Sequence, residues 1–483
     1  MDVTPPSPGL RGAGAELCFA SARDLAARIR SRQVSAREVM TACLQQISRL
    51  NPKLNAIVAK LDDEACLALA DQADRALGNG GPIGPLHGLP IAFKDLEPAV
   101  GFPQSKGSPI HKGLMPDADS VIVERLRRAG AIGIGKTNVP EFGMGSQTYN
   151  TVYGTTLNPY DPTRTAGGSS GGAAVAVATG MLPIADGGDL GGSLRNPANF
   201  NNIVSLRPSV GLVPIAPTSI PFVGVSTKGV LARSVADVAF GLSVVAGADA
   251  RDPQSFASNA DEFAGSLERD FRGVRVAWCP DLGGLPVDRR VRKVLDTRRK
   301  TFEELGCITE DACPDFGDVN EVFLTLRTWA SWTIYKDVLA QHRAVIKDDA
   351  IWDIESGRNV TGEDLGRALV QQGQLLERMR AFFARYEFLI CAVNQVPPFD
   401  ASTPWPASIE GVAMESYVSW MKSTYWISAT CCPAISVPAG FTDDGLPVGV
   451  QIVGGYRDDV NVLKIAHAFE SATGVGKRRP PNA

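Results

Sequence analysis

The chain has 483 residues, of which 44% are hydrophobic, 21% charged and 7% aromatic, a balance typical of a globular enzyme rather than of a disordered or fibrous protein. Its 48 Lys and Arg against 52 Asp and Glu leave a formal net charge of −4, so no basic excess indicates binding to nucleic acid or to an anionic membrane. The length fits one large α/β domain without requiring two.

We expect a cytoplasmic protein. The nine cysteines are odd in number and form no Cys-x-x-Cys pair, which indicates a reducing compartment. The N-terminus lacks the basic and apolar segments of a signal peptide, and no apolar run reaches about 18 residues, so we expect neither export nor a membrane span. Residues 1–20 are predicted to be an N-terminal tail.

Helix and strand signals alternate along the chain. Capping-box starts at Ser21 and Ser35 predict two helices, the second reaching about residue 49. Further helices are predicted over residues 62–77, 119–129, 173–178, 234–245, 286–305 and 363–386, and from about residue 460. Strands are predicted over residues 131–134, 182–185, 274–279, 434–438 and 448–453, and a short apolar run, 89–93, leads to Lys94. This alternation predicts an α/β fold with a mixed β-sheet.

A phosphate-binding loop is one interpretation of residues 130–137, which match G-x-x-x-x-G-K-T. Such a loop must follow a buried strand and open a helix, so that its amides face the phosphates. Here a charged helical segment precedes Gly130, and Pro140 shortly after the motif disfavours a helix. We therefore expect a strand and a turn.

The nucleophile elbow of α/β-hydrolases, G-x-S-x-G, is matched by residues 167–171. An elbow needs an apolar strand before it and a histidine base later in the chain. Residues 161–166 cannot form a buried strand, and none of the four histidines has a neighbourhood that suggests a base. This interpretation is therefore not favoured.

Two Gly-Gly-Ser units, ending at Ser169 and at Ser193, lie 24 residues apart. Paired glycines let the backbone approach a reacting group closely, and consecutive exposed N–H groups in a tight turn can stabilise an oxyanion. A small-residue helix and a strand join the units, which argues against two unrelated structural turns.

Residues 165–214, which contain both units, resemble the signature of the amidase signature family, G-G-S-S-G-G followed by a small-residue helix and G-[ST]-D-x-G-G-S-I-R-x-P-A. The similarity continues in residues 88–95, 135–142, 432–438 and 445–451. The resemblance implies a single large α/β domain over residues 21–475, with a core motif at 165–214 and a mixed central sheet covered by helices on both sides.

The resemblance also implies a Ser–Ser–Lys triad. Ser193 would be the nucleophile, Ser169, preceded by a cis peptide bond, would relay the proton, and Lys94 would be the base. The oxyanion hole would be formed by the backbone N–H groups of Leu190, Gly191, Gly192 and Ser193. This is chemically coherent, because a serine needs an adjacent base and a buried lysine has a lowered pKa. No metal and no cofactor is expected.

One departure from the family's motif lies close to the implied oxyanion hole. Gly188 stands where the family usually carries Ser or Thr. Asp189 and Arg195 are expected to brace the loop rather than to take part in the chemistry.

The implied function is that of a serine-dependent amidohydrolase, which cleaves C–N bonds of amides, and also carbamates and esters, through an acyl-enzyme on Ser193. The alternatives are the glutaminase subunit of a tRNA-dependent amidotransferase complex, which releases ammonia from glutamine for a partner, and a non-catalytic binding protein. We expect a small-molecule substrate, no nucleic-acid or membrane partner, and a monomer or homodimer.

A variable substrate-lining region is expected over about residues 315–430, where the resemblance is weakest. This region holds six of the seven tryptophans: Trp329, Trp332, Trp352, Trp405, Trp420 and Trp426. Variable segments over a fixed scaffold commonly line a substrate site, and tryptophans supply an apolar wall. We therefore predict an apolar or aryl substrate, such as an anilide or an aryl carbamate.

Overall fold

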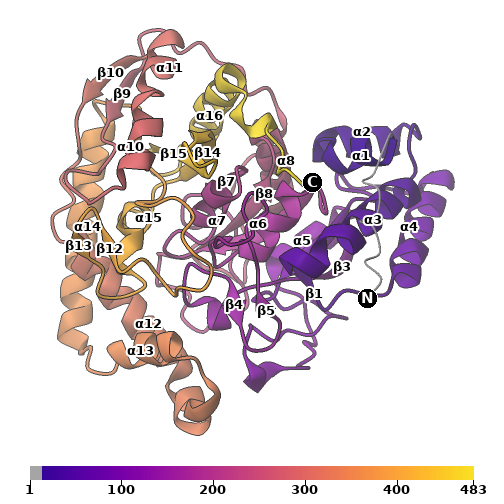
Figure 1. The fold of residues 1–483 in the computed structure, drawn as a ribbon, viewed down its shortest axis with the longest axis horizontal. Coiled ribbons are helices and arrows are strands. Elements are labelled where there is room, and N and C mark those ends of the chain that lie inside the picture. The colour runs from indigo at the N-terminus through magenta and orange to yellow at the C-terminus, as the bar shows by residue number, and fades with distance from the viewer. Residues whose placement is uncertain (1–12) are drawn as a thin grey trace, which may run out of the picture.

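An eight-stranded mixed β-sheet is the central feature of the computed structural model, which describes residues 13–483 (Figure 1). Its strands follow the order β10 (Ile308–Asp311), β9 (Arg275–Trp278), β11 (Phe388–Ala392), β15 (Pro447–Gly454), β14 (Ala434–Phe441), β7 (Val204–Arg207), β8 (Thr227–Ala232) and β6 (Ile184–Asp189). Strands β10, β9 and β11 are parallel, and the other neighbours are antiparallel. The predicted α/β fold with a mixed sheet is confirmed.

Helices cover both faces of this sheet, as expected. Successive side chains of a strand point to opposite faces, so Val276 and Trp278 of β9 pack in one buried cluster and Ala277 in another. The first cluster is covered by α8 (Val235–Val245), α10 (Arg289–Asp296), α11 (Arg299–Glu304) and α16 (Asp459–Thr473). The opposite face is covered by α6 (Gly171–Ala178), α7 (Arg195–Phe200), α12 (Val319–His342), α14 (Gly362–Phe383) and α15 (Lys422–Ala429).

A smaller sheet brings Lys94 to the edge of the large one. It contains β1 (Ile57–Val58), β3 (Ile132–Thr137) and β2 (Pro90–Lys94), with β2 parallel to β3. Every residue of β2 is buried, and the Lys94 N–H donates to Oδ1 of Asp186 in β6 over 3.0 Å. Because the Gly-Lys-Thr of residues 135–137 lies within β3, the expected strand replaces a phosphate-binding loop there.

The N-terminal helices begin at the predicted capping residues. Ser21 accepts a hydrogen bond from the Asp24 N–H at the start of α2 (Ala22–Arg30), and Ser35 forms a full capping box with Glu38 at the start of α3 (Ala36–Leu54). These are followed by α4 (Asp63–Gly78) and α5 (Val121–Arg128). The N-terminal helices and α12–α14 lie at opposite ends of the long axis (Figure 1).

Three parts of the chain differ from the expected elements. Residues 13–19 form α1 (Ala13–Phe19), with Leu17 and Cys18 buried, so the folded chain begins before residue 21; residues 1–12 of the expected tail lie outside the described residues. The helix predicted over 286–305 is divided into α10 and α11 around Thr297 and Arg298. The long helix α12 was not expected.

The remaining elements are short. They are α9 (Ala260–Ala264), α13 (Asp348–Ser356), the strand pairs β4 (Tyr149–Asn150) with β5 (Gly154–Thr155) and β12 (Ser408–Ile409) with β13 (Val412–Ala413), and 3₁₀ turns at Pro109–His111, Glu141–Gly143, Arg343–Val345, Ser419–Met421 and Val475–Lys477. Within residues 13–483, no helix has both the length and the apolar character needed to cross a membrane.

Candidate active site

Lys94 is fully buried at the carboxyl end of β2 and points at the first Gly-Gly-Ser unit. Its Nζ lies 2.9 Å from Oγ of Ser169 and 2.8 Å from Oγ of Ser170. A longer contact of 3.4 Å joins the same nitrogen to the carbonyl oxygen of Gly188 in β6. The predicted pairing of Lys94 with Ser169 is therefore present in the structure.

The first unit forms a buried turn immediately before α6. The Gly168–Ser169 peptide bond is cis, as the resemblance implied, and Ser169 is 3% exposed. The hydroxyls of Ser146 and Thr148 donate to the carbonyl oxygens of Gly168 and Gly167, each over 2.8 Å. These bonds fix the backbone that carries Ser169. No strand precedes the turn, so the elbow geometry is absent over residues 161–166.

The second unit connects β6 to α7 and lies against the first. Ser170 donates its N–H to the carbonyl oxygen of Ser193 over 3.2 Å. Ser193 is partly exposed, and its hydroxyl has no hydrogen-bond partner among the described residues. The backbone bond of Ser170 therefore places the second unit beside the turn that carries Ser169, and the joint action of Ser193 with Ser169 and Lys94 stays a prediction.

The four backbone amides of the predicted oxyanion hole differ in whether they already have a hydrogen-bond partner. In the part of the chain that the structure describes, the N–H groups of Leu190, Gly191 and Ser193 have no hydrogen-bond partner. Gly192 differs, because its N–H donates to Oδ1 of Asp189 over 2.8 Å. The role of these four amides in an oxyanion hole stays a prediction.

Gly192 is required at its position for two reasons. Its φ of +122° is a conformation that L-residues rarely adopt, and an added Cβ would lie only 2.5 Å from Oγ1 of Thr424. The sequence pattern had indicated close backbone approach at this unit, and the structure shows that the approaching group is α15.

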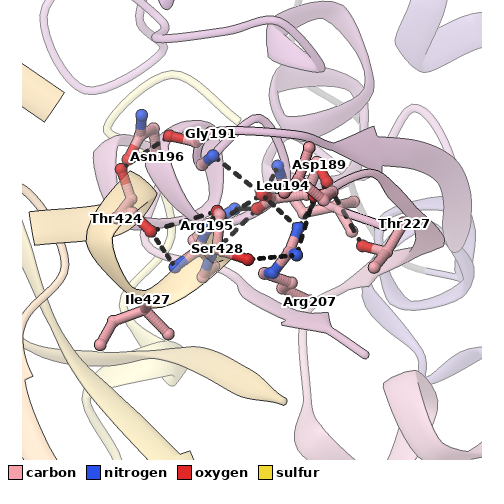
Figure 2. Close-up of polar contacts among 12 residues, drawn as sticks. Asp189, Gly191, Leu194, Arg195, Asn196, Arg207, Thr227, Thr424, Ile427 and Ser428 are labelled. Atoms are coloured by element: carbon pink, nitrogen blue, oxygen red, sulfur yellow. Dashed lines mark hydrogen bonds and ion pairs between the residues drawn. The ribbon is translucent and has the colours of Figure 1, made fainter. Parts of the chain in front are cut away.

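Asp189 holds the loop through two arginines that reach it from different directions (Figure 2). Nε and Nη2 of Arg195 donate to its two carboxylate oxygens over 3.0 and 2.9 Å, and Nη1 of Arg207 donates to Oδ1 over 3.3 Å. Burial alone would raise the pKa of Asp189, but the two guanidiniums outweigh it and hold the pKa well below its usual range. The expected bracing role of Asp189 and Arg195 agrees with this geometry, whereas Arg207 was not anticipated.

Helix α15 is tied directly to the second unit. The Thr424 hydroxyl lies 2.9 Å from the carbonyl oxygen of Gly191 and 3.0 Å from that of Met421. The Gly191–Gly192 peptide is thus held at its oxygen by Thr424, and the Gly192 N–H is held by Asp189. Residue 424 lies in the expected variable region, but its contact crosses more than 200 residues of sequence, so no local signal could have revealed it.

The tryptophans of residues 329–426 do not form one continuous wall. Trp420 is 1% exposed and stacks on Phe200, so it belongs to the core, whereas Trp352 is 44% exposed. Phe323 and Tyr425, whose rings stack with centroids 4.4 Å apart, pack against Gly191, and both are buried in the core as well. Trp329, Trp332, Trp405 and Trp426 are half-buried, and their contact with a substrate stays a prediction.

The environment of Lys94 favours its neutral amine. Burial lowers the pKa of Lys94 to about 7, and the nearby ammonium of Lys228 acts in the same direction, against the opposing effect of Glu97, Asp186 and Asp189. A lysine with this pKa can accept a proton near neutral pH. The site therefore combines a base, two hydroxyls and a group of unoccupied backbone donors.

Three comparisons relate this arrangement to known proteins. Residues 38–463 match the Amidase family model. The chain is 34% identical over 470 residues to an acylamidase of Rhodococcus erythropolis, covering 97% of this chain and 98% of that protein. It is 32% identical over 487 residues to the A subunit of glutamyl-tRNA(Gln) amidotransferase of Carboxydothermus hydrogenoformans, covering 96% and 99%. The crystal structure of a bacterial aryl acylamidase of the amidase signature family superposes with a TM-score of 0.88 at 29% identity, over 96% of this chain and 99% of the other.

Proposed function

Because the chain belongs to the amidase family and acts on C–N bonds, we propose that it is a serine-dependent amidohydrolase in which Lys94, Ser169 and Ser193 are the catalytic residues. The observation that carries this proposal is the 2.9 Å contact between Nζ of Lys94 and Oγ of Ser169, in a turn bonded to the backbone of Ser193.

The proposed reaction begins with two coupled proton transfers along this series of groups. Neutral Lys94 takes the proton of Ser169, which takes that of Ser193, while Oγ of Ser193 bonds to the carbonyl carbon of the substrate. The N–H groups of Leu190, Gly191 and Ser193 stabilise the oxyanion. The C–N bond breaks as the proton passes to the leaving nitrogen, and water then hydrolyses the acyl-enzyme and restores Ser193.

The same steps extend to carbamates and esters. A carbamate would leave a carbamoyl- or alkoxycarbonyl-enzyme on Ser193, and an ester would leave the same acyl-enzyme as the corresponding amide. An alkoxide leaves more easily than an unprotonated nitrogen, so ester cleavage depends less on proton transfer to the leaving group, and the proposed site should also cleave esters.

An apolar or aryl substrate is the proposed preference. The half-buried Trp329, Trp332, Trp405 and Trp426 lie in the region predicted to line the substrate site, and they carry this proposal. The similarity to an acylamidase and to an aryl acylamidase structure supports the same choice. A cytoplasmic location and a monomeric or homodimeric state stay predictions from the sequence.

The second candidate is a glutaminase component of an amidotransferase, which the similarity to the glutamyl-tRNA(Gln) amidotransferase protein supports. Purified chain alone, assayed on an aryl anilide, an aliphatic amide, an aryl carbamate, an aryl ester and glutamine, separates the two. We expect the highest kcat/KM on the aryl compounds, with little ammonia released from glutamine. A clear preference for glutamine would favour the amidotransferase function instead.

A further inference from the structure

A second ammonium group, that of Lys228, lies next to Lys94. Lys228 is directly opposite Gly188 in the antiparallel pairing of β8 with β6. Its ammonium forms an ion pair with the carboxylate of Glu97, which follows β2. The side chains of Glu97 and Lys228 are only 3% and 18% exposed, so water screens their charges weakly.

Gly188 is the residue that lies between the two ammonium groups. Nζ of Lys94 donates to its carbonyl oxygen over 3.4 Å, and a Cβ added at Gly188 would touch Cδ and Nζ of Lys228 at 3.5 Å. Gly188 therefore contacts Lys94 through its carbonyl oxygen and lies within van der Waals range of Lys228.

Four charged groups face Lys94. The like charge of Lys228 disfavours a proton on the Lys94 amine, whereas the carboxylates of Glu97, Asp186 and Asp189 favour it. Glu97 has a second effect, because it is also the ion-pair partner of Lys228. Lys228 and Glu97 thus act on the Lys94 amine in opposite directions.

We propose that Lys228, held by Glu97 and placed opposite Gly188, is a positioning residue that sets the proton affinity of the Lys94 amine and hence the pH range of turnover. This inference rests on the proposed role of Lys94 as the base. Lys228 does not touch the reacting atoms; it acts only through its charge on Lys94.

The test is the pH dependence of kcat/KM on an aryl anilide for the wild type, Lys228→Met, Glu97→Gln and the double variant. Lys228→Met keeps the apolar stem and removes the charge, so we expect the midpoint of the rise with pH to move alkaline by about one pH unit. Glu97→Gln leaves Lys228 without its carboxylate, so the midpoint should move towards acid. The midpoint of the double variant should lie closer to that of the wild type than the midpoint of either single variant. If Glu97→Gln alone does not fold, the double variant still tests the inference.

Lys293→Met is the matched control, because that lysine is 68% exposed and pairs with the surface residue Asp443. It should leave the midpoint unchanged. A lower rate at every pH with an unmoved midpoint in both Lys228→Met and the double variant would assign the pair a purely structural role and overturn the inference. The proposed function fails differently: in that case Lys94→Ala would retain turnover.

Discussion

Ser170, which directly follows the first Gly-Gly-Ser unit, donates its backbone N–H over 3.2 Å to the carbonyl oxygen of Ser193, the last residue of the second unit. The same Ser170 places its hydroxyl 2.8 Å from Nζ of Lys94. Ser170 therefore links the base to the proposed nucleophile through one backbone bond and one side-chain bond, and the two units form a single site.

The first prediction concerns pH. Since burial and the Lys228 ammonium lower the pKa of Lys94 to about 7, and only its neutral amine accepts a proton, kcat/KM of the wild type should rise from acid pH to a plateau with its midpoint near 7. Initial rates between about pH 5 and pH 10 measure this. A midpoint near the ordinary lysine value of about 10.4 would contradict the assigned environment of Lys94.

The second prediction is that the catalytic residues are not additive. Ser193→Ala should lower kcat by at least about 1000-fold, and the double variant Ser193→Ala, Lys94→Ala should be little worse, because residues that act as one unit lose their effect together. Single-turnover assays with thermal melts as a folding control measure this. If the fold-losses in kcat of the two single variants instead multiply in the double variant, Lys94 acts independently of Ser193.

The third prediction tests the support of the oxyanion loop by α15. Thr424→Val keeps the shape of the side chain and removes its hydroxyl, which leaves the Gly191 carbonyl oxygen without that bond. We expect kcat to fall by about tenfold with a smaller change in KM, because the loop amides lose their alignment. Thr424→Ser, which restores the hydroxyl, should recover most of the rate. If kcat falls equally in Thr424→Val and Thr424→Ser, the packing of the side chain matters and its hydrogen bond to Gly191 does not.

The fourth prediction concerns stability. Asp189→Asn leaves the buried guanidiniums of Arg195 and Arg207 without their carboxylate, so the free energy of unfolding should fall by about 3–5 kcal/mol. Because the folded pKa of Asp189 lies below its unfolded value, its stabilisation is complete at neutral pH and is lost only on acidification below about pH 5. Urea unfolding at neutral pH measures the difference.

Asp443→Asn is the control for this measurement, because Asp443 is 84% exposed in its surface pair with Lys293. It should change the free energy of unfolding by less than about 0.5 kcal/mol. If Asp189→Asn lowers the free energy of unfolding no more than Asp443→Asn does, the buried network does not stabilise the fold.

The elements that could be predicted well from the sequence are those with local causes. Ser35 and Glu38 form their capping box within four residues, and the apolar run before Lys94 becomes β2. The contact between Lys94 and Ser169 followed from the motif's resemblance to a known family, not from spacing, because 75 residues separate them.

The elements that could not be predicted depend on tertiary contacts. Helix α12 has no clear apolar stripe, because Arg327 and Ser331 are buried on it together with the apolar residues and are satisfied by Asp353. Lys228 and Thr424 reach the site from other strands and helices. Their roles depend on which groups lie beside them, and a local sequence pattern holds no information about those neighbours.

The most direct test of the proposed mechanism is to treat the enzyme with a fluorophosphonate or sulfonyl fluoride and to locate the label by peptide mass spectrometry. We predict one label per chain, on Ser193, with loss of activity in proportion to labelling and with little labelling of Lys94→Ala. A label on Ser169 with Ser193 unmodified would contradict the mechanism and make Ser169 the nucleophile.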